Sequence, residues 1–118
     1  MDRTENRAFV DRWVKDWNAH DLDAVLEHFA DHVVFTSPNA AEWIPASGGV
    51  IRGKAALREY WSVGLRAQPD LHFEVIASYA GVNTLVINFR NQHGRVANEV
   101  LTFDGPLVVE GHATHLDG

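Results

Sequence analysis

The stretch that decides the fold begins NAHDLDAVLEHFADHVVFTSP (residues 18–38) and, after a loop, continues GGVIRGKAALREYW (residues 48–61). The pattern predicts a short amphipathic helix that leads into a strand, and then a short strand that opens directly into another helix. The residues that follow alternate as strands up to position 115. Helices first and strands last favour helices packed on one face of a curved sheet, in an α+β fold. Such a sheet leaves a concave, mostly apolar cavity, where a small molecule would bind.

Helices are expected over residues 4–18, 22–29 and from Gly53 to Leu65. In the first helix Phe9, Trp13 and Trp17 are spaced four apart, so their rings share one stripe of its surface. Asp21 is a suitable N-cap for the second helix, because its carboxylate can accept from unpaired backbone N–H groups.

Strands are expected over the rest of the chain, separated by glycine-, proline- and asparagine-containing turns. Their ranges are residues 32–36, 50–52, 71–79, 84–91, 95–103 and 107–115, with residues 39–49 as a loop. In the last strand the less polar set is placed inward: Leu107, Val109, Gly111, Ala113 and His115. In the strand before it the inward set is Ala97, Glu99, Leu101 and Phe103, and Glu99 is the anomaly.

Length and composition exclude several classes of protein. The 118 residues suggest a single domain over residues 1–118. Without cysteine there are no disulfides, thiolate zinc ligands or thiol nucleophiles. A net charge of −6 with scattered basic residues argues against a nucleic-acid partner. The chain starts without a signal-peptide pattern and has no apolar run of about 20 residues, so we expect a cytoplasmic protein without a membrane partner.

No cofactor or metal is expected. The chain has no phosphate-cradling glycine loop and no G-x-S-x-G elbow around Ser37. His28 and His32 have the four-residue spacing of helical metal ligands, but no third ligand is evident. The sequence therefore indicates chemistry that uses side chains alone.

Four segments carry a family resemblance: Asn18-Ala19-His20-Asp21-Leu22, Phe29 to Phe35, Ile51 to Leu57, and Phe103-Asp104 with the strand after it. The chain resembles the nuclear transport factor 2-like superfamily, and within it the SnoaL-like polyketide cyclase and ketosteroid isomerase group. This likeness implies a cone-shaped, cystatin-like roll in which a curved antiparallel or mixed sheet wraps around three N-terminal helices. It is specific for the fold and weak for activity, because the superfamily hosts many functions.

Three roles of the isomerases can be carried over by position. The place of the general base reads Ser37, which is a poor base without a helper. The place of the oxyanion tyrosine on the first helix holds Trp13, which has no hydroxyl. The place of the second acid holds Glu99, so one of three roles is chemically retained. The Asp-Arg-Asp arrangement of the limonene-epoxide-hydrolase-like members is not evident, and Arg90 with Glu99 would form at most a partial version of it.

Glu99 is the strongest catalytic candidate. A carboxylate on an apolar inward face must pair, accept hydrogen bonds or protonate. Desolvation raises the pKa of such a group toward neutrality, which suits a general acid or base. The alternative is a structural partner of Arg90, Asn88 or His115. His115 is inward by alternation, matches a pocket-lining position of the family, and can form a dyad with Glu99.

The register of one hairpin is open. A two-residue loop places Glu99 opposite Asn88, with Arg90 on the same face. A loop of another length reverses the alternation and turns Ile87 and Phe89 inward. We carry Asn88 and Arg90 forward as groups that orient a substrate or stabilise developing negative charge.

The expected ligand-binding set consists of aromatic and small residues on the helices, the loop and the inward strand faces. Trp43 is in addition a possible lid on the Gly-flanked loop. The set is Trp13, Trp17, Phe29, Ser37, Trp43, Trp61, Leu101 and Ala113.

Two functions from different classes fit these patterns. The first is a cofactor-free acid–base isomerase, cyclase or hydrolase that acts on an apolar, carbonyl-bearing or polycyclic compound. The second is a non-catalytic ligand-binding or dimerisation module. For the second, a homodimer would form through the open sheet face, where Val96, Val100 and Val108 are expected to point outward.

Overall fold

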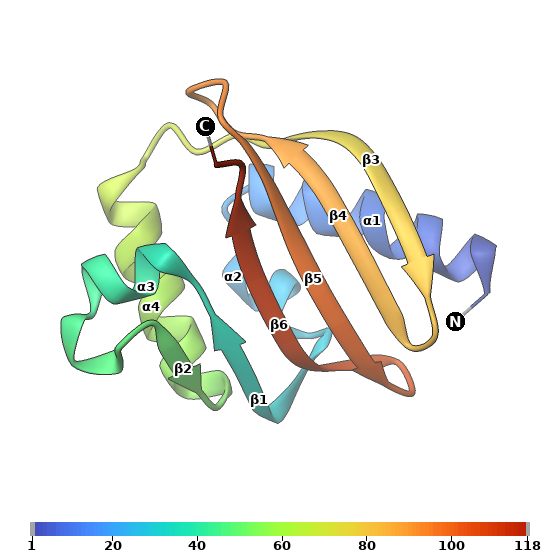
Figure 1. Ribbon diagram of the computed structural model, residues 1–118, viewed down its shortest axis with the longest axis horizontal. Helices are drawn as coiled ribbons and strands as arrows, with labels where there is room; N and C mark the ends of the chain where they lie inside the picture. Colours follow the sequence, from blue (N-terminus) through green and yellow to red (C-terminus); the bar gives the residue numbers. More distant parts are fainter. Residues whose placement is uncertain (1, 118) are drawn as a thin grey trace.

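One curved six-stranded sheet forms the larger layer of the molecule, and the helices cover one of its faces (Figure 1). The structure, a computed structural model, describes residues 2–117. Along the sheet the strand order is β2-β1-β6-β5-β4-β3, in which β1 and β6 run parallel and the other neighbours are antiparallel. This arrangement confirms the α+β fold with a mixed, curved sheet.

The elements are α1 (Arg3–Asn18), α2 (Leu22–Leu26), β1 (Phe29–Thr36), α3 (Pro38–Trp43), the 3-10 turn η1 (Pro45–Ser47), β2 (Val50–Arg52), α4 (Lys54–Ala67), β3 (Glu74–Gly81), β4 (Thr84–Arg90), β5 (Val96–Asp104) and β6 (Leu107–His115).

Helix α1 begins with a capping box, in which Asp2 and Glu5 each accept from the other's backbone N–H. Its aromatic stripe is buried against the sheet, as the four-residue spacing predicts. Phe9, Trp13 and Trp17 are each less than 5% exposed. The stripe therefore attaches α1 to the inner face of the sheet.

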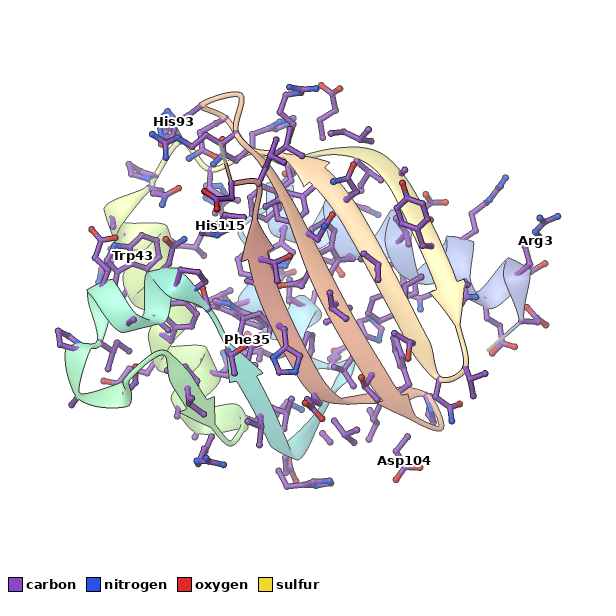
Figure 2. The ribbon with its side chains drawn as sticks, viewed as in Figure 1. Arg3, Phe35, Trp43, His93, Asp104 and His115 are labelled. Atoms are coloured by element: carbon purple, nitrogen blue, oxygen red, sulfur yellow. The ribbon has the colours of Figure 1, made fainter. Side chains whose placement is uncertain are left out.

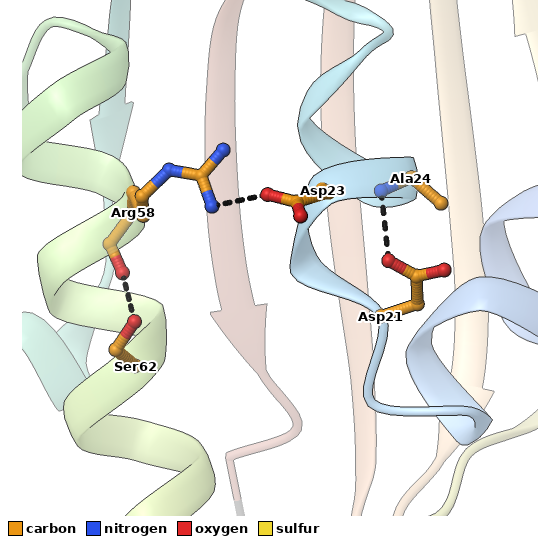
Figure 3. A network of polar contacts seen from close by, with 5 residues as sticks. All are labelled: Asp21, Asp23, Ala24, Arg58 and Ser62. Atoms are coloured by element: carbon orange, nitrogen blue, oxygen red, sulfur yellow. Dashed lines mark hydrogen bonds and ion pairs between the residues drawn. The ribbon is translucent and has the colours of Figure 1, made fainter.

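The short helix α2 lies between α1 and α4. Asp21 caps it by accepting from the Ala24 N–H at 3.1 Å, as expected (Figure 3). Arg58 of α4 forms an ion pair with Asp23 of α2 at 2.5 Å. Both side chains are substantially exposed, so this pair contributes little to stability. The prediction that the helix extends to Phe29 is wrong, because β1 begins at that residue and pairs with β6.

The segment expected as a loop over residues 39–49 is largely helical. Ser37 is the N-cap of α3, where its Oγ accepts from the Asn39 N–H at 3.2 Å, and Pro38 occupies the first turn. Proline favours this position because it needs no hydrogen-bond acceptor there. The Ser-Pro pair therefore ends β1 and also starts a helix.

The β4–β5 hairpin has a three-residue loop, residues 92–94. The Asn91 N–H donates to the Arg95 carbonyl at 2.8 Å, and the Asn91 side-chain oxygen accepts from the N–H groups of His93 and Arg95. Gly94 takes the positive φ (+78°) that this loop length requires. Ile87 consequently lies opposite Glu99, and Asn88 lies opposite Asn98.

The β5–β6 pair contains a register shift between Thr102 and Phe103 that skips Val109. Such a bulge reverses the side-chain alternation beyond it. Val108 is therefore fully buried and Leu107 is 39% exposed. The expected inward position of Leu107 and outward position of Val108 are wrong for this reason, while Gly111 is buried on the inner face as expected.

Candidate functional site

A cavity of about 730 Å³ opens between the inner face of the sheet, helices α3 and α4, and the β4–β5 loop. This volume lies within the range of small-molecule sites. Its interior wall is mostly aromatic, with Trp17, Phe35, Tyr60, Trp61 and Phe89 all buried. A ligand that enters it would leave water for an apolar surface.

Glu99 of β5 projects into this apolar wall. It is 6% exposed and faces inward, as the alternation predicts. Its Oε2 accepts the indole N–H of Trp13, on α1, at 2.6 Å. Among residues 2–117 this is the only hydrogen bond to the Glu99 carboxyl group, so Oε1 has no protein partner. One carboxyl oxygen is held by the protein and the other is available to a ligand.

Burial raises the pKa of Glu99 from 4.5 to about 7, and the hydrogen bond from Trp13 opposes that rise. Desolvation dominates because water is excluded from the ionised form. A group with this pKa exchanges its proton near neutral pH, which is the property that general acids and bases need.

A second polar pair lies on the same cavity wall. The Tyr60 Oη–H of α4 donates to Ser37 Oγ at 2.9 Å, and both side chains are buried. Burial raises the pKa of Tyr60 to about 12, so the phenol stays protonated. Ser37 Oγ also accepts from Asn39, so its own hydroxyl hydrogen is the remaining donor.

Tyr60 was not among the expected site residues. Its helical spacing beside Trp61 indicates packing, and that is also correct. The available signal was chemical, because a buried tyrosine hydroxyl usually needs a partner. Sequence alone does not show that this partner is Ser37.

The indole ring of Trp17 lines the cavity, but its N–H is covered by protein. Its Nε1 is enclosed and has no hydrogen-bond partner among the described residues. Buried polar groups are seldom left unpaired.

The structure brings most of the expected site residues together, but not all. Those that line the cavity are Glu99, Arg90, His115, Trp17, Ser37, Trp43, Trp61 and Ala113. The other four are Asn88, Trp13, Phe29 and Leu101.

The expectation that the other four line the cavity is wrong for identifiable reasons. Trp13 lies behind Glu99 and contacts Phe73 and Phe89. Phe29 is packed beneath Trp61, with ring centroids 5.3 Å apart. Leu101 is fully buried.

Asn88 lies on the outer face of the sheet. Its side-chain amide donates to Asn98 Oδ1 at 2.8 Å, on the neighbouring strand. The three-residue loop selects the register in which Ile87 and Phe89 are inward. The expected position of Asn88 beside Glu99 is therefore wrong.

His115 lies at the exposed edge of the cavity, opposite Ala97. The expected dyad with Glu99 is not formed, since the hydrogen bond to that carboxyl group comes from Trp13. Figure 2 shows His115 and His93 on the same side of the molecule as Trp43. Trp43 is half-buried, and its ring lies against Gly64 of α4.

The described residues contain neither a metal-binding cluster nor a membrane-spanning helix. Over residues 2–117, no group of three or more His, Cys, Asp or Glu side chains is placed to hold a metal ion. No helix within the same range has the length and apolar character needed to cross a membrane.

Comparison with known proteins shows the family to which the chain belongs. A family model described as the SnoaL-like domain matches residues 10–114. The chain belongs to the SnoaL-like domain family. No curated protein matches the sequence. The resemblance derived from the four sequence segments is thereby confirmed.

Solved structures agree on the fold. A SnoaL-like protein of unknown function from Burkholderia thailandensis is 40% identical, with a TM-score of 0.91 and 99% of each chain covered. A proposed polyketide cyclase from Sinorhizobium meliloti is 14% identical, with a TM-score of 0.75, covering 91% of this chain and 94% of that one. A cystatin-like protein of unknown function from Methylobium petroleophilum is 16% identical, with a TM-score of 0.78, covering 100% and 80%. The two more distant structures share the fold alone.

Proposed function

We propose that this protein binds an apolar, carbonyl-bearing or polycyclic compound in the cavity and catalyses a cofactor-free proton transfer on it. The observation that carries the proposal is the carboxyl group of Glu99, one oxygen of which is held by Trp13 while the other has no protein partner. The aromatic wall fits such a substrate. The Sinorhizobium meliloti structure has the same fold. Its description as a polyketide cyclase is consistent with a substrate of this kind.

The chemistry is a proton transfer at a carbon next to a carbonyl group. The ionised Glu99 removes the proton, and the electron pair of the broken C–H bond moves onto the carbonyl oxygen. The protonated Glu99 then returns a proton to carbon. The Ser37 hydroxyl on the same wall is suited to the negative charge that develops on oxygen.

Exchange of hydrogen for deuterium in 2-tetralone tests this proposal. This bicyclic ketone has acidic hydrogens between its ring and its carbonyl group. We expect the protein in D₂O to accelerate their loss from the ¹H NMR spectrum, and the rate to rise with pH around a midpoint near 7.

Glu99→Gln should remove the acceleration and keep the fold, because the glutamine amide oxygen can accept from Trp13. The matched control is Glu59→Gln, which changes an exposed carboxylate on α4. Equal exchange rates for Glu99→Gln and the wild type would exclude Glu99 as the base. A protein that binds 2-tetralone without accelerating exchange would favour the non-catalytic function.

We also infer that two copies pair through the outer face of the sheet. Tyr79, Val86, Val100 and His112 lie opposite one another in a row across β3, β4, β5 and β6. Tyr79 is 61% exposed, and the row offers a partly apolar surface. Val108, one of three valines expected there, is buried and plays no part.

Sedimentation equilibrium at micromolar concentration tests the pairing. A dimer that Val100→Lys converts to a monomer supports the inference, because an added ammonium group must be desolvated at the centre of the row. The control Ser78→Lys places the same charge on the exposed edge strand β3. A wild-type monomer contradicts the inference.

A further inference from the structure

The rim of the cavity is cationic, although the protein as a whole is acidic. The chain has a formal net charge of −6. Nevertheless, the exposed residues that line the cavity include Arg90, Arg95, His93 and His115. Among residues 2–117 the only acidic residue that lines it is Glu99, which is buried at the interior wall. Charge is therefore distributed unevenly, with the basic groups at the entrance.

The fold gathers these four residues from three adjacent strands. Arg90 ends β4, His93 lies in the loop, and Arg95 directly precedes β5. His115 ends β6, two residues beyond the partner of Glu99. Figure 1 shows the end of β6 beside the β4–β5 loop. The strand order thus determines which side chains surround the entrance.

Arg95, which alternates with the inward Ala97 and Glu99, forms no ion pair among residues 2–117, whereas Arg90 has Glu74 as its strand partner. Within residues 2–117, the ion pairs join Arg58 to Asp23 and His112 to Glu110, all remote from the entrance. Asp70 directly precedes Leu71 and Asp117 directly follows Leu116. Both leucines line the cavity, but neither aspartate does. Guanidinium groups favour carboxylates, which they bind through two parallel hydrogen bonds. An unpaired cationic rim over an apolar interior matches a ligand that is apolar along its body and anionic at one end.

The separation along β5 sets the length of that ligand. Arg95 and Glu99 are four residues apart on one strand, which corresponds to roughly 13 Å of backbone. Ala97 lies between them on the same face and leaves space above it. The side chains of Arg95 and Glu99 cover part of the separation between their backbones. A ligand body of two or three fused rings spans the rest.

We propose that the natural ligand carries a carboxylate that remains at the cavity entrance, bound by Arg95, while its fused-ring body extends toward Glu99. This inference rests on the proposed function, since it requires that the cavity binds small molecules. It adds the charge and the orientation of the ligand. The end that reacts is the end remote from the carboxylate.

Isothermal titration calorimetry with 2-naphthoate and its neutral analogue 2-naphthamide tests the inference. We expect the wild type to bind the carboxylate roughly fivefold more tightly than the amide at low ionic strength. The preference should decrease in 0.5 M NaCl, because salt screens exposed charges. Arg95→Gln and the double variant Arg90→Gln, Arg95→Gln should lose the preference while binding of 2-naphthamide is kept.

Two controls accompany these variants. Arg52→Gln removes the same charge from an exposed position on β2 outside the cavity, and it should keep the preference. Arg12→Gln changes an exposed arginine on α1 outside the cavity and should also keep it.

Four results separate the two proposals. A preference that is lost only in the entrance variants supports the inference. Equal affinity for the two probes, or a preference that the arginine variants retain, overturns it. Binding of 2-naphthamide without 2-naphthoate overturns the inference and leaves the proposed function standing. If neither probe binds, both proposals are contradicted.

Discussion

Trp13 donates its indole N–H to Oε2 of Glu99 at 2.6 Å, although the two residues are 86 positions apart in the sequence. Both are buried, so the hydrogen bond forms where water cannot replace it. An indole N–H can only donate, and Oε2 therefore stays an acceptor. Trp13 thus occupies the position expected for an oxyanion donor but contacts the acid itself.

Trp13→Phe should raise the pKa of Glu99 above 7, because the hydrogen bond that favours the ionised form is removed. A ¹³C NMR titration of the Glu99 carboxyl group measures this. The lost partner should also lower the free energy of unfolding by about 1–3 kcal/mol. Trp17→Phe is the control, since the Trp17 indole N–H has no protein partner. An unchanged Glu99 titration in Trp13→Phe would contradict the assigned contact.

Glu99 should make the protein less stable as the pH rises. Its folded-state pKa of about 7 lies above the ordinary value of 4.5, so between these values the folded protein holds more protons than the unfolded chain. The free energy of unfolding then falls with rising pH across this window, by on the order of 3 kcal/mol. Chemical denaturation at pH 5 and pH 8 measures the fall.

Glu99→Gln should remove this slope and should therefore be more stable than the wild type at pH 8. Glu59→Gln should keep the slope. A wild type whose stability rises between pH 5 and pH 8 relative to Glu99→Gln is incompatible with a buried Glu99 whose pKa is raised.

Gly111 of β6 should not tolerate a methyl group. A Cβ built there would lie 2.7 Å from the ring of Phe35, which is fully packed on the neighbouring strand. We expect Gly111→Ala to destabilise the protein by about 1–3 kcal/mol through overpacking. Gly81→Ala is the matched control, because a Cβ there meets Thr84 at an ordinary 3.6 Å. Similar melting temperatures for the two variants would refute the close contact.

Ser37→Ala should cost more stability than Tyr60→Phe. The alanine leaves the buried Tyr60 hydroxyl without an acceptor and removes the N-cap of α3. Together these losses amount to about 2–4 kcal/mol. Tyr60→Phe removes a donor and leaves Ser37 bound to Asn39, at about 1 kcal/mol. Urea unfolding of both variants decides the order, and the reverse order would contradict it.

The order of the elements other than α3 and η1 could be predicted from the sequence, and so could the inward position of Glu99. Both depend on periodicity, which is a local property of the sequence. On α1 three aromatic side chains are spaced four residues apart, and on β5 the carboxylate of Glu99 belongs to an alternating apolar set. The SnoaL-like family was evident from four short segments. The helical content after Ser37 was missed because Pro38 was interpreted only as the end of a strand.

The tertiary structure alone decided the register and the partners. Asn91 closes a three-residue loop by its side chain, and that one-residue difference turns Ile87 rather than Asn88 toward the cavity. A bulge near Phe103 buries Val108 in the same way. The hydrogen bond from Trp13 and the cationic entrance each join residues from separate elements. Sequence periodicity shows which face of a strand or helix a residue occupies, but contacts between distant elements form only when loops set the alignment and the chain packs.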